Sequence, residues 1–185
     1  MLREQRERRK GLKLGHMTGR NNRLRAVYLF SVIDEDSAQD VIEELLELDT
    51  DRKKRPITLY ISCPGGYCSY AMGIIDVIEK LRCPTKAIAL GDVSSMAPLI
   101  FVACDERVIS KHAFIMLHPI AGGSQDYMQF VKSRLKNMEA VEKQYEKYFL
   151  SKTTLPKKLY AKSRSAELWL TAEEAIKYGI AHKIM

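Results

Sequence analysis

The chain has 185 residues, of which 46% are hydrophobic and 29% are charged, and its formal net charge is +7. This is the size of one ordinary domain, which buries enough apolar surface to fold without disulfides or metal ions. The apolar runs fall well short of the ~20 residues of a membrane-spanning helix, and the basic N-terminus is not followed by a signal-peptide core. We therefore expect no membrane contact and a cytoplasmic location.

The net charge belongs to the N-terminal segment. Residues 1–25 hold nine Lys or Arg against two Glu, so the remainder of the chain is balanced. Few apolar anchors and many charges are typical of a mobile arm or of a segment that a partner orders. We accordingly divide the chain into a basic arm at 1–24 and one globular domain at 25–185. Nucleic-acid binding through the arm is an alternative, which the balanced charge of the domain disfavours.

In the first half of the domain, strands alternate with helices. We expect strands at 26–32, 57–62 and 85–90, helices at 36–48, 70–81 and 95–104, a tight turn at 64–66, and two further strands at 107–110 and 113–117. These follow from apolar periodicity and from Gly and Pro positions. The alternation indicates an α/β domain built from right-handed crossovers, with functional residues at the carboxyl ends of strands.

The second half begins with a long amphipathic helix at 126–150. Its apolar residues recur every three or four positions over about seven turns. This exceeds a typical globular helix, so part of the stripe is expected to face another subunit; packing on its own domain is equally consistent with the periodicity. Thr171 followed by Glu174 predicts a capping box for a last helix, which Gly179 ends before a strand at 180–184.

Neither metal nor cofactor chemistry has a signature in the sequence. There are four cysteines without a CxxC pair, which indicates free and mostly buried thiols. A paired-His metal motif, a Walker loop and a dinucleotide fingerprint are all missing from the sequence. We expect no metal ligands and no cofactor in this chain.

Ser95 is the strongest candidate for covalent chemistry. It follows a predicted strand and opens a predicted helix, where its hydroxyl can project and free backbone N–H groups can surround an oxyanion. An ordinary N-cap serine has the same local pattern. Gly65 and Gly66 offer backbone that a substrate carbonyl can approach closely, although a plain turn is the simpler reading of a Gly pair.

His118 is the best candidate for a base. It ends an apolar strand and precedes Pro119, where a ring can leave the sheet and face a cleft. The choice is by elimination, because His16 belongs to the arm and His112 and His182 lie in polar surroundings near segment ends.

Four segments, in order and spacing, resemble the Clp protease proteolytic subunit (ClpP) family. They are Ser62-Cys63-Pro64-Gly65-Gly66, Gly91 to Met96, Ile115 to Pro119 followed by Gly122-Gly123, and Leu170 to Ala175 with Tyr178-Gly179. The resemblance is continuous from Leu24 to the end. It implies the ClpP/crotonase-like fold, a spiral of βαβ units with a protruding long helix at about 126–150.

The resemblance also implies a serine-type endopeptidase. Ser95 would be the nucleophile, His118 the general base, and the N–H groups of Gly66 and Met96 the oxyanion hole. The implied assembly is a homo-oligomer of heptameric rings, stacked as a tetradecamer around a chamber. An AAA+ unfoldase, which uses ATP, would feed it unfolded polypeptide, and this chain would need no cofactor of its own.

The sequence departs from the family pattern in three places. Glu167 stands where the family has the Asp of the catalytic triad, so Glu167 is the candidate acid. Ser165-Ala166 replaces an acidic-Arg pair that links the two rings, which predicts weaker stacking. Cys63, with Tyr67 and Cys68, is expected to alter the rim of the substrate groove.

Two alternatives to an active peptidase remain at this stage. A non-catalytic or weakly active subunit of a mixed ring fits the altered acid region but not the intact Ser95 and His118 pair. A crotonase-like acyl-CoA enzyme shares the expected core and the use of backbone N–H donors, yet it gives no reason for a nucleophilic serine.

Overall fold

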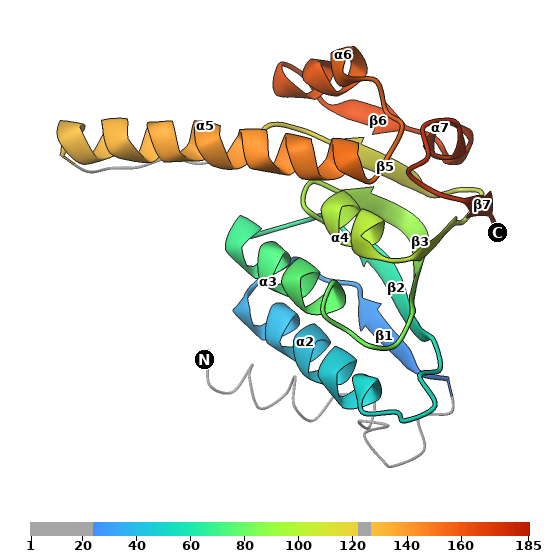
Figure 1. The fold of residues 1–185 in the computed structure, drawn as a ribbon. Coiled ribbons are helices and arrows are strands. Elements are labelled where there is room, and N and C mark those ends of the chain that lie inside the picture. The colour runs from blue at the N-terminus through green and yellow to red at the C-terminus, as the bar shows by residue number, and fades with distance from the viewer. Residues whose placement is uncertain (1–23, 122–126) are drawn as a thin grey trace, which may run out of the picture.

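The computed structural model describes residues 24–121 and 127–185, which form a mixed α/β fold around a mostly parallel sheet (Figure 1). The predicted basic arm lies outside the described residues except for Leu24, and so does the Gly122-Gly123 segment. The α/β prediction is confirmed.

One seven-stranded sheet organises the domain, and its main path runs β1-β2-β3-β4-β7. The strands are β1 (Ala26–Leu29), β2 (Ile57–Cys63), β3 (Thr85–Ser94), β4 (Glu106–Ile109), β5 (Phe114–Leu117), β6 (Leu168–Leu170) and β7 (Lys183–Ile184). Strands β1 to β5 and β7 pair in parallel, whereas β5 and β6 pair antiparallel. The first half of β3 pairs with β4 and its second half with β5, so β3 forks the sheet.

Strand β3 is longer than the sequence predicted, because Gly91 does not end it. Gly91 has a φ of 55°, a left-handed conformation that glycine adopts without steric cost. There the register against β2 shifts, from Ile61 opposite Ala89 to Cys63 opposite Val93. A bulge of this kind redirects a strand without ending it. The second half of β3 is thereby carried alongside β5, where the candidate site lies.

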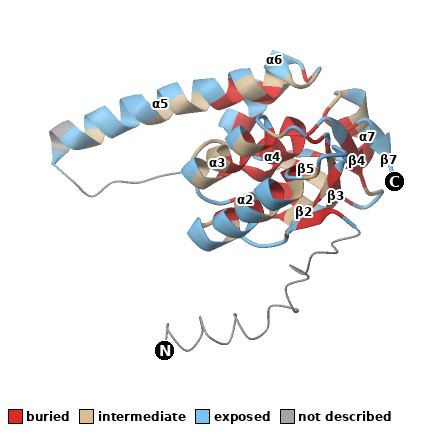
Figure 2. Ribbon diagram, turned by 60° about the horizontal axis from the view of Figure 1, so that its bottom comes forward, coloured by how far each residue is buried: buried red, intermediate tan, exposed pale blue. Residues whose placement is uncertain are grey.

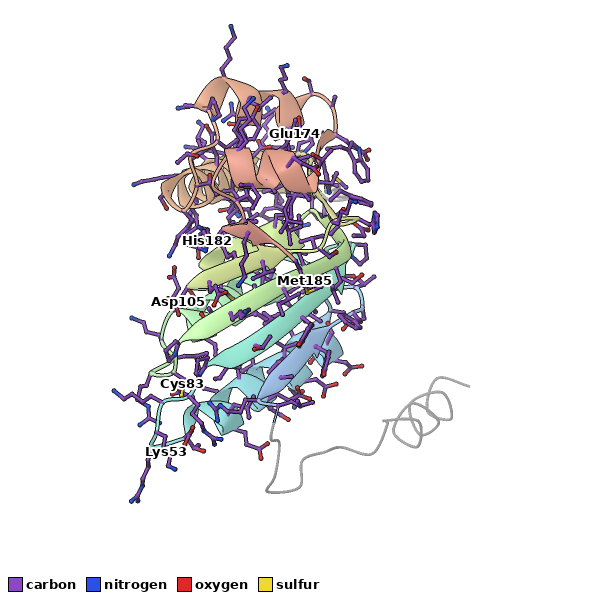
Figure 3. The ribbon with its side chains drawn as sticks, turned by 90° about the vertical axis from the view of Figure 1, so that its right-hand side faces the viewer. Lys53, Cys83, Asp105, Glu174, His182 and Met185 are labelled. Carbon is purple, nitrogen blue, oxygen red and sulfur yellow. The ribbon has the colours of Figure 1, made fainter. Side chains whose placement is uncertain are left out.

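The helices lie mainly on one face of this sheet. They are α2 (Glu35–Asp49), α3 (Cys68–Ile78), α4 (Ala97–Ala103), α5 (Met128–Ser151), α6 (Lys157–Tyr160), the 3-10 turn η1 (Ala161–Arg164) and α7 (Ala172–Lys177). Figure 1 shows α2, α3 and α4 side by side on one side of β1 to β3. Figure 3 looks onto the other side, where no helix of the described residues covers these strands, and places Cys83 and Lys53 far from Glu174.

Local capping explains the helix starts that were predicted well. The Asp34 carboxylate accepts the Ser37 N–H at 2.9 Å, which begins α2. The predicted box at α7 is confirmed: the Glu174 N–H donates to the Thr171 hydroxyl at 3.3 Å, and Thr171 N–H donates to the Glu174 carboxylate at 2.9 Å.

Several predicted boundaries are wrong. Strand β1 ends at Leu29 and not at Val32, α3 spans Cys68–Ile78 and not 70–81, α4 begins at Ala97 and not at Ser95, and the last strand contains only Lys183–Ile184. The short elements α6, η1 and β6 were not predicted. Elements of three or four residues carry too little periodicity to be recognised, and they form here because they pack on other parts of the domain.

The side chain of Arg25, the residue at the predicted start of the domain, is anchored to the backbone of other segments. The Arg25 guanidinium is buried and donates to the carbonyls of Leu48, Arg55 and Pro56 at 2.8, 3.0 and 3.2 Å. All four cysteines are free as expected, and Cys68 is the one that is not fully buried. Within the described ranges, no helix has the length and apolar character to cross a membrane, and no cluster of potential metal ligands forms.

Helix α5 projects from the body of the domain (Figures 1 and 2). Near its C-terminal end, Tyr145 and Phe149 are buried in the core, with 8% and 0% exposure. Toward its other end, Phe130 and Leu135 are 49% and 56% exposed. The last turns of α5 therefore pack on their own domain, and its first turns are uncovered in the single chain.

Candidate active site

Ser95 directly follows β3, in a conformation that few non-glycine residues adopt. Its φ is 62°, in the left-handed region, where a side chain costs ~1–2 kcal/mol. The Ser95 N–H donates to the Met116 carbonyl of β5 at 2.9 Å, which holds the sharp turn in place. Backbone strain that the surrounding structure maintains is a recurring property of functional residues. Ser95 is thus not the ordinary N-cap of α4, whose N-cap position is Met96.

His118 reaches Ser95 because their strands are neighbours. Strands β3 and β5 pair in parallel up to Ser94 opposite Met116, so the residues that follow lie at the same edge of the sheet. The His118 Nε2 atom lies 2.8 Å from the Ser95 Oγ atom, which is hydrogen-bonding distance. In the neutral tautomer that carries its proton on Nδ1, Nε2 accepts the serine proton. His112 is exposed and His182 lies against Arg107, so neither shares this edge with Ser95.

The Gly65-Gly66 turn lies against Ser95 so closely that it excludes side chains. A Cβ atom on Gly65, whose φ is 93°, would lie 2.4 Å from the Ser95 Cβ atom, and one on Gly66 would lie 2.2 Å from the Ile33 carbonyl oxygen. Ile33 clamps the turn: its N–H donates to the Gly65 carbonyl at 2.8 Å, and its carbonyl accepts the Tyr67 N–H at 2.8 Å. Glycine is required at both positions because of these contacts. Sequence reasoning did not identify Ile33, whose role is carried by its backbone.

Two backbone N–H groups near Ser95 remain available for an incoming oxygen. Ile33 bonds to the residues on either side of Gly66, and the Gly66 N–H itself donates to no backbone carbonyl in the described part of the chain. The same holds for the Met96 N–H, which directly follows Ser95. Met96 and Gly66 both lie in the wall of the small pocket that contains Ser95 and His118. They are the two residues for which the family resemblance implies a role as oxyanion-hole donors.

Cys63 does not form the rim of the groove, contrary to our expectation. Its side chain is fully buried beneath the turn, where its sulfur accepts the Gly65 N–H at 3.3 Å. Burial raises the pKa of the Cys63 thiol to about 11, with Asp92 adding to the rise and the Gly65 hydrogen bond opposing it. Cys63 is therefore a neutral thiol that supports the turn from below. Tyr67 and Cys68 line a hollow next to the turn.

Glu167 directly precedes β6, the strand that pairs with β5, but its carboxylate does not bond to His118. The antiparallel ladder of β5 and β6 ends with Leu117 opposite Leu168. His118 follows Leu117 and Glu167 precedes Leu168, so these two residues come next beyond the end of the ladder. Residues opposite each other in such a ladder are near neighbours. The exposed Glu167 carboxylate accepts the Trp169 indole N–H at 2.9 Å, and among the described residues no carboxylate is hydrogen-bonded to the His118 ring.

Two adjoining hollows share lining residues, and the smaller of them contains Ser95. A groove of about 590 Å³ runs between the start of α3 and α5, and Tyr67, Met138 and Tyr145 are part of its wall. A smaller pocket of about 100 Å³ contains Ser95 and His118 and extends to Glu142 and Tyr160. Sequence reasoning missed the pocket residues of α5. The sequence contains one sign of them. Glu142 follows Met138 by four positions, so it places a charge on the apolar face of the helix.

The hydroxyl of Ser95, the imidazole of His118 and two available backbone N–H groups lie together at one edge of the mostly parallel sheet. An α/β protein with these groups in one place belongs to a class suited to acyl transfer. Comparison with known proteins specifies the family. The chain belongs to the Clp protease family, whose family model matches residues 9–185.

Two curated relatives illustrate the similarity. The chain is 28% identical over 165 residues to "ATP-dependent Clp protease proteolytic subunit 2" of Thermobifida fusca (strain YX), an alignment that covers 88% of this chain and 81% of that protein. It is also 28% identical over 163 residues to "ATP-dependent Clp protease proteolytic subunit" of Porphyromonas gingivalis (strain ATCC BAA-308 / W83), covering 87% of this chain and 73% of that protein.

Proposed function

We propose that this chain is a proteolytic subunit of an ATP-dependent Clp protease and that it cleaves peptide bonds through Ser95. The observation that carries the proposal is the 2.8 Å contact between Ser95 Oγ and His118 Nε2, on a strained turn beside two available N–H donors. Family membership and the names of the two relatives support the same role. The chemistry needs no metal ion or organic cofactor in this chain.

In the proposed reaction, His118 Nε2 takes the Ser95 proton as the hydroxyl oxygen attacks the peptide carbonyl. The carbonyl oxygen becomes an oxyanion, which the N–H groups of Gly66 and Met96 stabilise; each such donor contributes ~10²–10³ in rate. The imidazolium of His118 then protonates the leaving amine, and the C–N bond breaks. Water hydrolyses the resulting acyl ester by the same steps, and Ser95 is regenerated.

Glu167 is the proposed third member of the site. A carboxylate that accepts the His118 Nδ1–H would fix the productive tautomer and stabilise the imidazolium. The strand register supports this role, because Leu117 pairs with Leu168 and the next two residues beyond that pair are His118 and Glu167. Its bond to Trp169 means that the carboxylate must exchange one donor for the other.

The proposed assembly is a homo-oligomer of heptameric rings stacked as a tetradecamer. The uncovered first turns of α5, with Phe130 and Leu135 half exposed, supply an apolar surface for a neighbouring copy. Ser165 and Ala166 are exposed and uncharged, which supports weaker stacking than a charged pair would give.

The proposed partner is an AAA+ unfoldase that consumes ATP and delivers unfolded polypeptide. On the uncovered side of the sheet, Tyr28 stacks on Tyr60 at 5.3 Å and contacts Phe30 edge-on at 5.7 Å between ring centroids. Tyr28 and Phe30 are 53% and 55% exposed, so this aromatic surface is available to another protein.

Fluorophosphonate labelling of the purified protein, with native mass measured in parallel, tests the proposal. The probe should attach to Ser95 in a multi-subunit particle, and Ser95→Ala should abolish labelling and peptide hydrolysis without unfolding the chain. His118→Ala should be nearly as damaging, and the double variant no worse than either single one, because these residues act as a unit. Peptide hydrolysis by Ser95→Ala at the wild-type rate would refute the assignment.

A weakly active subunit of a mixed ring is the second candidate, and the bond between Glu167 and Trp169 favours it. In that case the fluorophosphonate probe would react slowly with Ser95 of the chain alone. Adding a partner subunit that has a complete catalytic triad would accelerate this reaction. A monomer that neither labels nor cleaves under any condition would contradict both candidates.

A further inference from the structure

The small pocket that contains Ser95 also has a carboxylate in its wall. The wall includes Ser95, His118 and Gly66 together with Glu142, Tyr145 and Tyr160. If a carbonyl on Ser95 directs its oxygen at Gly66 and Met96, the side chain on the acyl side of the scissile bond enters this pocket. The chemistry of the pocket wall therefore bears on which residue is accepted before the cleaved bond.

Glu142 brings a carboxylate into the wall of this pocket. Its side chain is half-buried, and no cation of the described residues forms an ion pair with it. One turn further along α5, the buried Glu146 carboxylate pairs with Arg164, and with Lys157 at 3.8 Å. Both of these cations are thus directed at Glu146, and neither forms an ion pair with Glu142.

The hydroxyl of Tyr160, another residue of the pocket wall, is affected by the charge of Glu142. The pKa of Tyr160 is raised to about 12, first because the hydroxyl is buried and then because Glu146 and Glu142 oppose its ionisation, while Arg164 acts in the other direction. At neutral pH the phenol is thus uncharged. Tyr145 and Tyr160 are buried residues of the pocket wall and offer ring surface for an aliphatic stem.

We propose that Glu142 is a specificity-determining residue that selects Lys or Arg as the residue preceding the scissile bond. A lysine stem packs between apolar and aromatic walls, and its ammonium group reaches the Glu142 carboxylate, which gains a partner that the chain itself does not provide. The inference rests on the proposed function, because it assumes that Ser95 carries the acyl group.

The test compares two otherwise identical fluorogenic peptides with lysine or norleucine before the cleaved bond. Norleucine has the same straight chain without the charge, so the ratio of the two kcat/KM values isolates the ion pair. We expect wild-type protein to prefer lysine by about fivefold, the worth of one partly exposed ion pair. Glu142→Gln should bring the ratio close to one, and Glu142→Lys should reverse it.

Glu139→Gln is the matched control, because Glu139 is an exposed glutamate one turn earlier on α5 and lies outside the pocket. It should leave the wild-type ratio unchanged. A ratio near one in wild-type protein, or an equal change in both glutamine variants, would overturn the role of Glu142 while the peptidase assignment stands. Absence of Ser95 labelling and of cleavage of both peptides would instead point to failure of the proposed function.

Discussion

Replacing Gly65 with alanine is the most direct perturbation of the candidate site that leaves Ser95 and His118 themselves unchanged. The added Cβ atom would lie 2.4 Å from the Ser95 Cβ atom and 2.9 Å from the Ser95 Oγ atom. Carbon atoms in contact prefer ~3.5–4.0 Å, so Ser95 or the turn must move by about 1 Å. A displacement of this size at a reacting atom costs about 10² in rate.

The same substitution also strains the backbone. The φ of Gly65 is 93°, a conformation in which a side chain costs ~1–2 kcal/mol. We therefore expect Gly65→Ala to lower the free energy of unfolding by about 1–3 kcal/mol and to slow fluorophosphonate labelling and kcat/KM by about 10²-fold. Denaturant unfolding measures the first quantity, and single-turnover labelling of Ser95 measures the second.

Gly73→Ala is the matched control within the same domain. Gly73 lies in α3 with a normal helical conformation, and a Cβ atom there meets only the Ile42 Cδ1 atom, at 3.9 Å. The same added methyl should raise the free energy of unfolding by ~0.5–1 kcal/mol and leave the labelling rate unchanged. A Gly65→Ala protein that labels as fast as wild type would refute the argument that this turn positions Ser95.

Three further predictions follow from individual contacts. Ser95→Gly should be more stable than Ser95→Ala by about 1 kcal/mol in denaturant unfolding, although both lack the hydroxyl, because only glycine relieves the left-handed φ of 62°; the opposite order would show that the turn is unstrained. Glu167→Gln should reduce kcat by up to ~10⁴ if Glu167 is the acid, whereas Trp169→Phe, which removes the donor bonded to that carboxylate, should not reduce it; a fully active glutamine variant would exclude Glu167. Asp49→Asn should destabilise the fold by about 2 kcal/mol at pH 7, since the Asp49 carboxylate accepts the Cys83 N–H at 2.8 Å and charged acceptors form the stronger hydrogen bonds. Burial alone would raise the pKa of Asp49, but its hydrogen bonds hold it below 3.8, so its stabilisation is complete above that pH and is lost as the pH falls through the folded-state pKa. Urea unfolding from pH 7 to pH 2 should show a shallower loss of stability for the asparagine variant, and parallel curves would contradict the assignment.

The sequence by itself determined the parts of this protein that depend on short-range pattern. Apolar periodicity predicted the helix 36–48 within a residue of α2, and Thr171 with Glu174 predicted the cap of α7, because both signals act over one or two turns. Ser95 and His118 were chosen from their places at strand ends, which is where parallel strands bring functional residues together. The family was also apparent, since four segments appear in the same order.

Only the tertiary structure decided the features that depend on neighbours distant in the chain. The bulge at Gly91 and the forking of β3 arise from pairing with β2, β4 and β5, so no local signal reveals that the strand continues. The burial of Cys63 beneath the turn is likewise set by packing. Periodicity predicted the apolar stripe of α5 but not which part of the stripe is buried. The same apolar pattern runs along the whole helix, whereas the rest of the domain covers only its C-terminal turns.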